Sequence, residues 1–527
     1  MPDILLTTLN AKYIHAAFGL RYLMANLGGL RSRAAIAEFD INQRPVEIAG
    51  TILGHHPRIV GIGVYIWNVA PATELVAILR AARPDLVIVL GGPEVSYECD
   101  RQEIVRLADY VITGEADLKF AEVCETLLTG NRPPFKIIPA DIPDVGSMQL
   151  PYDDYDDRDA AHRVIYVEAS RGCPFTCEFC LSSLDIPVRQ FPLPPFLNAM
   201  QRLLDRGVRQ FKFVDRTFNL NLETSRSILQ FFLARWTPGL FVHFEMVPDR
   251  LPEALREVIA QFPPGALQFE VGIQTFNPEV ERLISRRQNH ERLNDNLHWL
   301  REQSGVHVHA DLIAGLPGET LVSFAAGFDR LVAMRPQEIQ VGILKRLRGT
   351  PIGRHDAEWQ MVYNPHPPYE ILQNRLLDFA TVQFLRRFSR FWDLYSNSGH
   401  FLESLPWIWK RADGSGDSPF AGFQSFCAWL NERGTKTSGI ALTRQYELLW
   451  EYIVGVRAGD RLKFGPVLSQ DYRRSGRSDL PSWLLGGGND RGNSKKARAS
   501  GLPVRQARHL ERAEPATRTA DQSNPGS

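Results

Sequence analysis

Three closely spaced cysteines give this chain its clearest chemical signal. Cys173, Cys177 and Cys180 follow the pattern C-x3-C-x2-C, directly after an apolar, β-rich run at 164–167. A closed zinc site needs four ligands, whereas a [4Fe–4S] cluster takes one thiolate for each iron. Three thiolates from one loop would therefore leave one iron open to a cofactor or a substrate.

The sequence offers no nearby fourth ligand. No cysteine follows Cys180 until Cys427, and His162 lies at the far end of the preceding strand. At ~3.3 Å per residue, that histidine is roughly 20 Å away. His243 or His309 could reach the loop, so a zinc-stabilised binding protein with a Cys3His site stays open as a remote alternative.

Composition is typical of an ordinary globular protein. The 527 residues carry 60 basic and 60 acidic side chains, which gives no general electrostatic reason to bind nucleic acid or membrane. No run is long enough for a transmembrane helix, and residues 1–6 lack the basic region of a signal peptide. Six scattered or clustered cysteines are not a disulfide framework, so we expect a cytoplasmic protein. We expect Cys99, Cys124 and Cys427 to be small core residues.

The elements that must position the cysteine loop alternate regularly between strand and helix. Strands are expected at 164–169, 210–214, 240–246, 267–273, 306–313 and 338–344. Helices are expected at 194–206, 222–236, 252–261, 278–285, 291–303 and 321–334. Six βα units in succession predict an α/β domain over 161–350, an open (β/α)6 partial TIM barrel with its chemistry at the strand C-termini.

Polar side chains follow most of these strands. Asp215 and Arg216 follow the second strand, Glu245 ends the third, Gln274 follows the fourth, and Asp311 lies in the fifth. We expect such groups to share one rim of the barrel. By contrast, the sequence places Glu281, Arg282 and Arg286 on a solvated helix face.

The first 140 residues predict a second parallel sheet. Strands at 4–9, 35–39, 59–66, 86–90 and 110–113 alternate with helices at 17–27, 71–82 and 117–128. This Rossmann-like pattern places ligand-binding loops at the strand carboxyl ends, which carry Asn10, His15, Gly91 and Gly92. The two glycines would let the backbone approach a ligand closely. No dinucleotide fingerprint or P-loop is present.

The cysteine pattern, with Phe179 directly before its last member, resembles the signature of the radical S-adenosylmethionine (SAM) superfamily. Segments 271–277 and 311–320 resemble the fourth- and fifth-strand segments of its coproporphyrinogen-oxidase-like and methylthiotransferase-like branches. The resemblance implies that the three cysteines bind a [4Fe–4S] cluster whose open iron chelates the amino and carboxylate groups of SAM. It also implies a flavodoxin- or ferredoxin-type electron donor and reductive cleavage of SAM.

Other roles of the family transfer only in part. Members of the family often carry a Gly-Gly-Glu-type segment after the second strand, but 214–218 lacks these glycines. In its place, Asp215 could accept from the SAM ammonium group and Arg216 could clamp its carboxylate. Glu245 is a candidate for the same shell. The resemblance places Gln274 near the ribose and Phe179 near the adenine.

A βαβ domain before such a barrel resembles the class with an N-terminal cobalamin-binding domain. Segments 91–94 and 112–115 are similar to that class, which implies a cobalamin held near Asn10, His15, Gly91 and Gly92. The Asp-x-His-x-x-Gly stretch that supplies a cobalt ligand elsewhere is missing, so no ligand to cobalt is predicted. Methyl transfer to carbon is the expected outcome. A cobalamin-independent oxidation, rearrangement or sulfur insertion, or a domain that only docks substrate, is the alternative.

The remaining segments complete the predicted organisation. A linker spans 141–160, and a mainly helical domain spans 351–484, with helices expected at 370–389, 391–395, 420–433 and 441–456. This domain resembles the helical domain of unknown function that follows some cobalamin-type radical SAM proteins. A tail at 485–527, rich in Gly, Ser, Arg and Pro, is expected to be disordered. No nucleic-acid module is visible, and nothing selects a substrate.

Overall fold

The computed structural model describes residues 1–185, 187–409, 417–477, 481, 484 and 502–510. The chain forms two compact units. The first comprises Met1–Phe262 with Ala266–Ser389, and the second comprises Pro263–Gly265 with Arg390–Ser527. The predicted sites all lie in the first unit.

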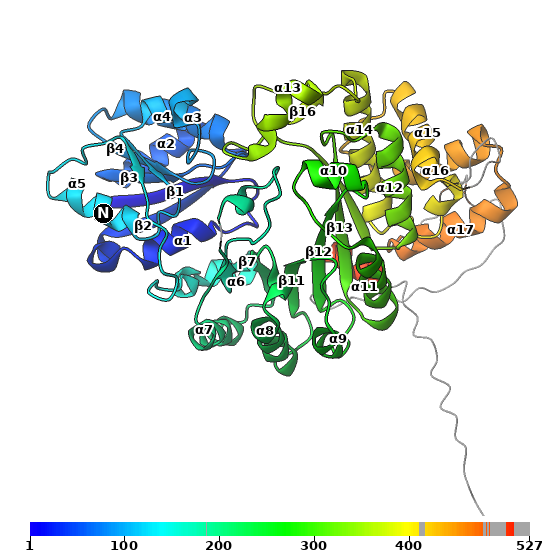
Figure 1. Cartoon of the computed structure of the whole chain (residues 1–527), viewed down its shortest axis with the longest axis horizontal. Helices are drawn as coiled ribbons and strands as arrows, with labels where there is room; N and C mark the ends of the chain where they lie inside the picture. The colour runs from blue at the N-terminus through cyan, green and yellow to red at the C-terminus, as the bar shows by residue number, and fades with distance from the viewer. Residues whose placement is uncertain (186, 410–416, 478–480, 482–483, 485–501, 511–527) are drawn as a thin grey trace, which may run out of the picture. The chain divides into compact units, whose positions relative to one another are not determined.

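The N-terminal part of the first unit is a six-stranded parallel sheet with the strand order β2-β1-β3-β4-β5-β6 (Figure 1). Its strands are β1 (Ile4–Asn10), β2 (Ala34–Asp40), β3 (Ile59–Gly63), β4 (Val87–Gly91), β5 (Tyr110–Thr113) and β6 (Ile137–Pro139). Its helices are α1 (Phe18–Ala25), α2 (Pro45–Gly54), α3 (Val69–Ala82), α4 (Glu103–Leu107) and α5 (Lys119–Leu128). The predicted Rossmann-like fold is confirmed, although β6, α2 and α4 were not expected.

Alternating side chains of this sheet fill two separate cores. Leu5 and Leu9 of β1 pack against α2 and α3, whereas Ile4 and Leu6 pack against α1 and α5. Helices therefore cover both faces, as the near-continuous apolar strands require (Figure 1). The strand order reverses direction between β1 and β3, which is where ligands bind in sheets of this kind.

The second sheet is parallel and has the strand order β14-β13-β12-β11-β10-β7. Each strand therefore pairs with the next strand of the barrel in chain order. The strands are β7 (Ile165–Val167), β10 (Gln210–Phe213), β11 (Phe241–Met246), β12 (Leu267–Gln274), β13 (His307–Ala314) and β14 (Glu338–Ile343). The helices are α7 (Leu193–Asp205), α8 (Leu222–Ala234), α9 (Glu253–Ile259), α10 (Pro278–Leu283), α11 (His290–Gln303) and α12 (Leu321–Ala333). This arrangement confirms the predicted (β/α)6 partial barrel.

The second unit is helical. It contains the end of α14 (Phe379–Trp392), together with α15 (Pro419–Glu432), α16 (Leu442–Trp450), α17 (Arg461–Arg474) and α18 (Val504–Leu510). Aromatic contacts form its core, such as Tyr395 with Phe426 at a 5.0 Å centroid distance. Helices α17 and α18 were not expected. Within the described ranges, no helix has the length and apolar character needed to cross a membrane.

Helix α18 corrects part of the predicted disordered tail. The Arg505 side chain donates to the Asn397 carbonyl at 2.7 Å, and His509 is buried. These contacts hold a segment whose composition alone predicted disorder. The rest of 485–527 lies outside the described residues. The other predicted domain boundaries stay predictions.

Candidate functional site

A small antiparallel hairpin carries the cysteine loop. Its strands are β8 (Ser170–Arg171) and β9 (Arg189–Gln190), and the loop runs between them. Gly172 has φ +89°, and a Cβ there would lie 2.8 Å from the carbonyl oxygens of Asp185 and Pro187. The Cys173 amide also donates to the Asp185 carbonyl at 2.9 Å. Glycine is therefore required where the loop closes on itself.

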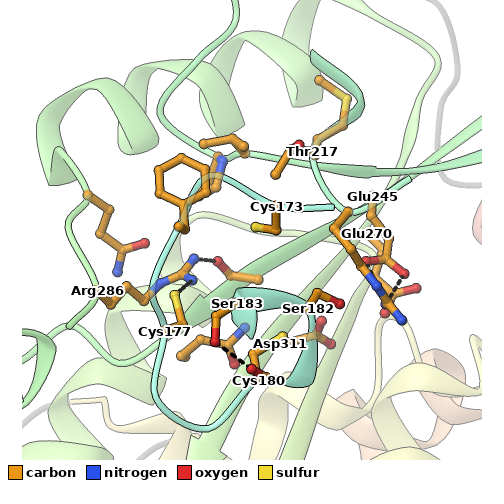
Figure 2. A pocket seen from close by; sticks show the side chains of 18 of the residues that line it. Cys173, Cys177, Cys180, Ser182, Ser183, Thr217, Glu245, Glu270, Arg286 and Asp311 are labelled. Atoms are coloured by element: carbon orange, nitrogen blue, oxygen red, sulfur yellow. Dashed lines mark hydrogen bonds and ion pairs between the residues drawn. The ribbon is translucent and has the colours of Figure 1, made fainter. Parts of the chain in front are cut away.

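All three cysteines line one cavity of about 260 Å³ at the carboxyl ends of the barrel strands. Figure 2 shows their side chains around this cavity, with Arg286 beside Cys177. We call it the inner cavity. Among the residues that share it are Phe175, Phe179, Arg216, Thr217, Glu245, Asp249, Glu270, Gly272, Gln274, Arg286, Arg287, Gln288 and Asp311. The structure thus brings the cysteines together with Phe179, Arg216, Glu245 and Gln274, as the sequence predicted.

Burial controls the protonation of two of the thiols. Cys173 and Cys177 are both buried, and desolvation raises the pKa of each thiol. The Arg286 guanidinium opposes this effect at Cys177, because its Nη1 lies 3.6 Å from the sulfur. Metal binding needs deprotonated thiolates, and a nearby cation favours that form.

The prediction that Arg286 lies on a solvated helix face is wrong. Helix α10 ends at Leu283, and Ser285 turns the chain with φ +53°. Arg286 then enters the inner cavity and donates to the Gly272 carbonyl. The sequence held one signal for this, since Asn289 caps the next helix and leaves 284–288 as a loop.

The same prediction placed Glu281 and Arg282 on the solvated face, and it is right for only one of them. Arg282 is 68% exposed, as expected, whereas Glu281 is buried. The Glu281 carboxylate accepts from the Gln288 amide at 2.5 Å and pairs with His290 at 2.6 Å. These contacts hold the loop that delivers Arg286.

Charged groups on adjacent strands line the floor of the inner cavity. Glu245 and Glu270 are register partners on β11 and β12, so they share one face of the sheet. Arg216 donates to Glu245 at 2.8 and 3.0 Å, and His243 lies 3.1 Å from Glu270. Burial raises the pKa of Glu245. Burial by itself would also raise the pKa of Glu270. The hydrogen bond with His243 and the charge of Lys212 outweigh this effect and hold the Glu270 pKa below its usual range.

The two histidines that could complete a zinc site are engaged inside the barrel. His243 faces Glu270, and His309 lies 3.3 Å from Asp311 and 3.6 Å from Glu338. Among the residues for which the structure gives a placement, no group of three His, Cys, Asp or Glu side chains is arranged to hold a single metal ion.

Gln274 is aimed into the inner cavity by a local irregularity of β12. The pairing of β12 with β13 shifts register between Gly272 and Gln274, and Gln274 has φ +73°. A Cβ on Gly272 would lie 2.4 Å from the Gln274 amide nitrogen. A bulge of this kind redirects a side chain, and residues held at positive φ are common at functional sites.

Asp215 does not line the inner cavity, which corrects the role expected from the sequence. Its carboxylate accepts from the Ala169 amide at 3.0 Å and from the Ser170 hydroxyl at 2.6 Å. It is buried, and desolvation raises its pKa to about 7. Asp215, which follows β10, therefore fastens the end of that strand to the start of the hairpin that carries the cysteines.

The residues predicted to hold cobalamin lie at the carboxyl edge of the first sheet. Asn10 donates to Glu38 at 2.6 Å, and His15 Nδ1 lies 2.7 Å from the Tyr166 hydroxyl. Burial lowers the pKa of His15 and favours its neutral form. A Cβ on Gly92, which has φ +108°, would lie 2.5 Å from the Val64 carbonyl oxygen. Gly92 is thus needed for the fold, independently of any ligand.

Exposed apolar side chains gather on the loops of the same edge. Tyr13, Trp67, Tyr97 and Leu118 follow β1, β3, β4 and β5, and each is 37–47% exposed. Trp67 stacks on Tyr65 at a centroid distance of 4.5 Å. Exposed apolar surface of this kind marks binding sites, and it suits a large flat ring.

Three family models match successive parts of the chain. They are a B12 binding domain at 4–124, the radical SAM superfamily at 167–330, and a protein family of unknown function, DUF4080, at 357–514. Residues 167–330 thus form a domain of the radical SAM type, preceded by a domain of the B12-binding type. These domain types agree with the predicted enzyme and with the predicted cofactors, and the chain spans less than two thirds of the length of the curated relative reported below.

One curated protein and two solved structures are similar to this chain over half of its length or more. An uncharacterized methyltransferase of Pyrococcus horikoshii is 26% identical over 309 residues, which are 52% of this chain and 64% of the relative. The structure of OxsB, a cobalamin-dependent SAM radical enzyme, has a TM-score of 0.58 at 11% identity and covers 97% of this chain and 84% of its own. The radical SAM methyltransferase TsrM of Kitasatospora setae has a TM-score of 0.56 at 16% identity, with 71% and 80% covered. These two likenesses show the fold.

Ion pairs tie the B12-binding domain to the cysteine hairpin of the radical SAM domain. Arg171 Nη1 lies 2.8 Å from Glu115 and 2.9 Å from Asp117, and its Nε donates to Glu168 at 2.9 Å. Arg189 also pairs with Glu115. Glu115 therefore contacts both strands of the hairpin, at the two ends of the cysteine loop.

Proposed function

We propose that the protein is a cobalamin-dependent radical SAM enzyme that cleaves SAM reductively and modifies a carbon atom of a substrate. The observation that carries this proposal is the inner cavity, in which three thiols from one loop meet an arginine and carboxylates at the strand ends. Cys173, Cys177 and Cys180 would ligate the cluster. When bound, the cluster supplies the electron that cleaves SAM, and cobalamin supplies a methyl donor.

The inner cavity contains polar atoms with few or no partners that suit SAM. Arg286 Nε is buried and has no hydrogen-bond partner in the described structure, and buried Asp311 Oδ1 has only His309 Nε2 near it, at 3.3 Å. A buried donor or acceptor left unpaired is costly, so such atoms indicate a polar ligand. In the proposal, Arg286 binds the SAM carboxylate and Asp311 accepts from a ribose hydroxyl.

Other residues of the inner cavity would orient SAM. Glu245 is an acceptor for the ammonium group, while its contact with Arg216 fixes its position. Gln274 would meet the ribose, as the family resemblance implies. Phe179 and Val247 supply apolar surface for the adenine.

Methyl transfer is the outcome that the comparisons favour. The Pyrococcus relative and TsrM are both named methyltransferases, and the exposed aromatic loops of the B12-binding domain suit a corrin ring. The substrate, and the activity of the whole protein, are part of the proposal. A low-potential electron carrier and a cytoplasmic location belong to it as well.

Anaerobic reconstitution tests the core of the proposal. The wild type should bind iron and sulfide, give a reduced-cluster EPR signal, and convert SAM to 5′-deoxyadenosine; with methylcobalamin bound, a methyl group should also pass to the substrate. Cys177→Ala should lose the iron, whereas the control Cys124→Ala, in a buried position of the first sheet's core, should retain it. An intact cluster without SAM cleavage would refute the proposal.

Corrin binding separates the two outcomes of SAM cleavage. Protein expressed with added hydroxocobalamin should show corrin absorbance after gel filtration. Cleavage of SAM by protein that binds no corrin would assign the enzyme to oxidation, rearrangement or sulfur insertion. A preparation with one zinc and no iron would favour the binding-protein alternative.

A further inference from the structure

A second cavity opens on the outer side of the cysteine loop, and we call it the outer cavity. Pro174, Phe175 and Thr176, the residues between the first two cysteines, form part of its wall. It shares Phe175, Asp249, Arg286, Arg287 and Gln288 with the inner cavity. Only a thin layer of side chains therefore separates the outer cavity from the cysteines.

The loop tip between these cysteines reaches the surface. Pro174 and Thr176 are exposed, whereas their neighbours Cys173 and Cys177 are buried. Each of these two buried cysteines is therefore next to an exposed residue in the chain. Electron transfer weakens steeply with distance, so this tip is a short route from the outside to a cluster on the cysteines.

The surface around the outer cavity carries unpaired positive charge. Arg250 and Arg287 line it, and Arg292 lines an adjoining cavity that shares Asp249 and Arg250. All three arginines are exposed, and the described structure gives none of them an ion-pair partner. We call these three residues the arginine surface.

The acidic residues of the two cavities offset the arginine surface only in part: Asp249, Glu281 and Asp295 stand against six arginines, at positions 250, 256, 282, 286, 287 and 292. Asp249 accepts from the Asn289 amide at 2.8 Å, and Glu281 is buried against Gln288 and His290. Exposed Asp295 faces the adjoining cavity. The N-terminus of α11, which starts at His290, adds positive potential on the same side.

We propose that the arginine surface docks an acidic, low-potential electron-carrier protein of the flavodoxin class, which reduces the cluster through the 174–176 tip. The carrier is oxidised by one electron and the cluster is reduced by one. This inference rests on the proposed function. Exposed charges of this kind mainly steer association, and their effect falls with ionic strength.

The position of the arginines favours a protein over an anionic substrate. Arg250 and Arg292 do not line the inner cavity, where SAM and a substrate would meet. They are spread over an exposed surface that spans two cavities, which suits the broad acidic face of a carrier. A small anion would instead need buried and convergent donors.

The test compares a protein reductant with a small one, using the reconstituted holoenzyme. The variant is Arg250→Glu with Arg292→Glu, and a glutamate at position 292 suits the first turn of α11. The control is Arg132→Glu. Arg132 is another exposed arginine, and it lies in the B12-binding domain, between α5 and β6. SAM cleavage is measured with flavodoxin and its reductase, and separately with titanium(III) citrate.

At low salt, the double variant should raise the KM for flavodoxin roughly tenfold or more, with a weaker salt dependence than the wild type. Cleavage with titanium(III) citrate should not change, and Arg132→Glu should behave as the wild type in both assays. Direct binding of oxidised flavodoxin, measured by calorimetry, should weaken in parallel.

Two results would overturn the docking proposal. One is an unchanged KM and binding constant for flavodoxin. The other is an equal loss with both reductants, which would assign the arginines to an anionic ligand. If the wild type cleaves no SAM with titanium(III) citrate, the proposed function fails, while the calorimetric comparison still decides whether the arginine surface binds the carrier.

Discussion

Removing Arg171 should show how strongly the B12-binding domain holds the cysteine hairpin. Its side chain is 13% exposed and lies against carboxylates of Glu115, Asp117 and Glu168 at 2.8–2.9 Å. Arg171→Gln would leave these carboxylates close together without their cation. Breaking a buried ion pair by removing one partner typically costs about 3–5 kcal/mol.

A matched surface variant calibrates this cost. Arg202 lies 3.1 Å from Asp153, but the two side chains are 52% and 67% exposed, so Arg202→Gln should cost about 1 kcal/mol or less. The first compact unit has 386 residues, and at ~2.1 cal/mol/K of unfolding entropy per residue, 3–5 kcal/mol corresponds to a Tm decrease of roughly 4–6 °C. Differential scanning calorimetry of the cluster-free proteins at pH 8 measures both variants.

The pH dependence gives a second test of the same reasoning. In the wild type, burial acts to raise the pKa of Glu115, but Arg189 and Arg171 hold it below its usual range. The stabilisation from Glu115 is therefore present above its unfolded pKa and is lost as the pH falls through its folded pKa. Without Arg171, burial raises the pKa values of the clustered carboxylates. Protonation should then relieve them, so that the deficit of Arg171→Gln is smaller at pH 5 than at pH 8.

The reasoning is refuted if Arg171→Gln costs no more than Arg202→Gln at pH 8, or if its deficit is the same at both pH values. A supporting result has a functional counterpart. Because Arg171 belongs to the strand that precedes Cys173, the reconstituted variant should lose iron to oxygen faster than the wild type.

Three further predictions concern single residues. Folded Asp215 has a pKa of about 7, so its protonated state contributes stability that is lost as the pH rises through 7; urea unfolding of Asp215→Asn should therefore change less between pH 5 and pH 8 than that of the wild type. Arg286→Lys should weaken SAM binding about 10- to 100-fold in equilibrium dialysis, through the loss of a charge-assisted hydrogen bond, with unchanged iron content; unchanged affinity would contradict the role of Arg286. Gly92→Ala should lower the Tm, because its Cβ would meet the Val64 carbonyl, whereas Gly91→Ala, with its nearest atom at 3.8 Å, should keep the Tm. If Gly91 approaches a corrin, its variant should lose hydroxocobalamin absorbance, and a full corrin load would exclude that contact.

Most of the strands could be derived from the sequence because parallel strands buried on both faces read as apolar runs. The runs at 240–246 and 267–273 became β11 and β12 with ends shifted by no more than one residue. Short elements were missed where this signal is weak. Strand β6 has three residues and is partly exposed, and α4 has five residues.

In the candidate site too, features set by neighbouring residues could be predicted, whereas features set by residues distant in sequence could not. The cysteine loop is local, so its spacing alone predicted three thiols around one site. Asp215 and Arg286 were misplaced because their environments depend on contacts with residues distant in sequence. Asp215 turns toward the Ala169 amide, 46 positions earlier in the chain, and Arg286 is turned inward by a positive φ at Ser285.

By itself, the sequence determined the two parallel α/β domains, the three-thiol loop and the resemblance to radical SAM proteins, because each depends on residue types at short, regular spacings. Only the tertiary structure decided which polar groups share the inner cavity, that Glu115 contacts both ends of the cysteine loop, and that the arginine surface lies next to its exposed tip. These relations join residues that are far apart in the chain, and loop conformation and strand register bring them together.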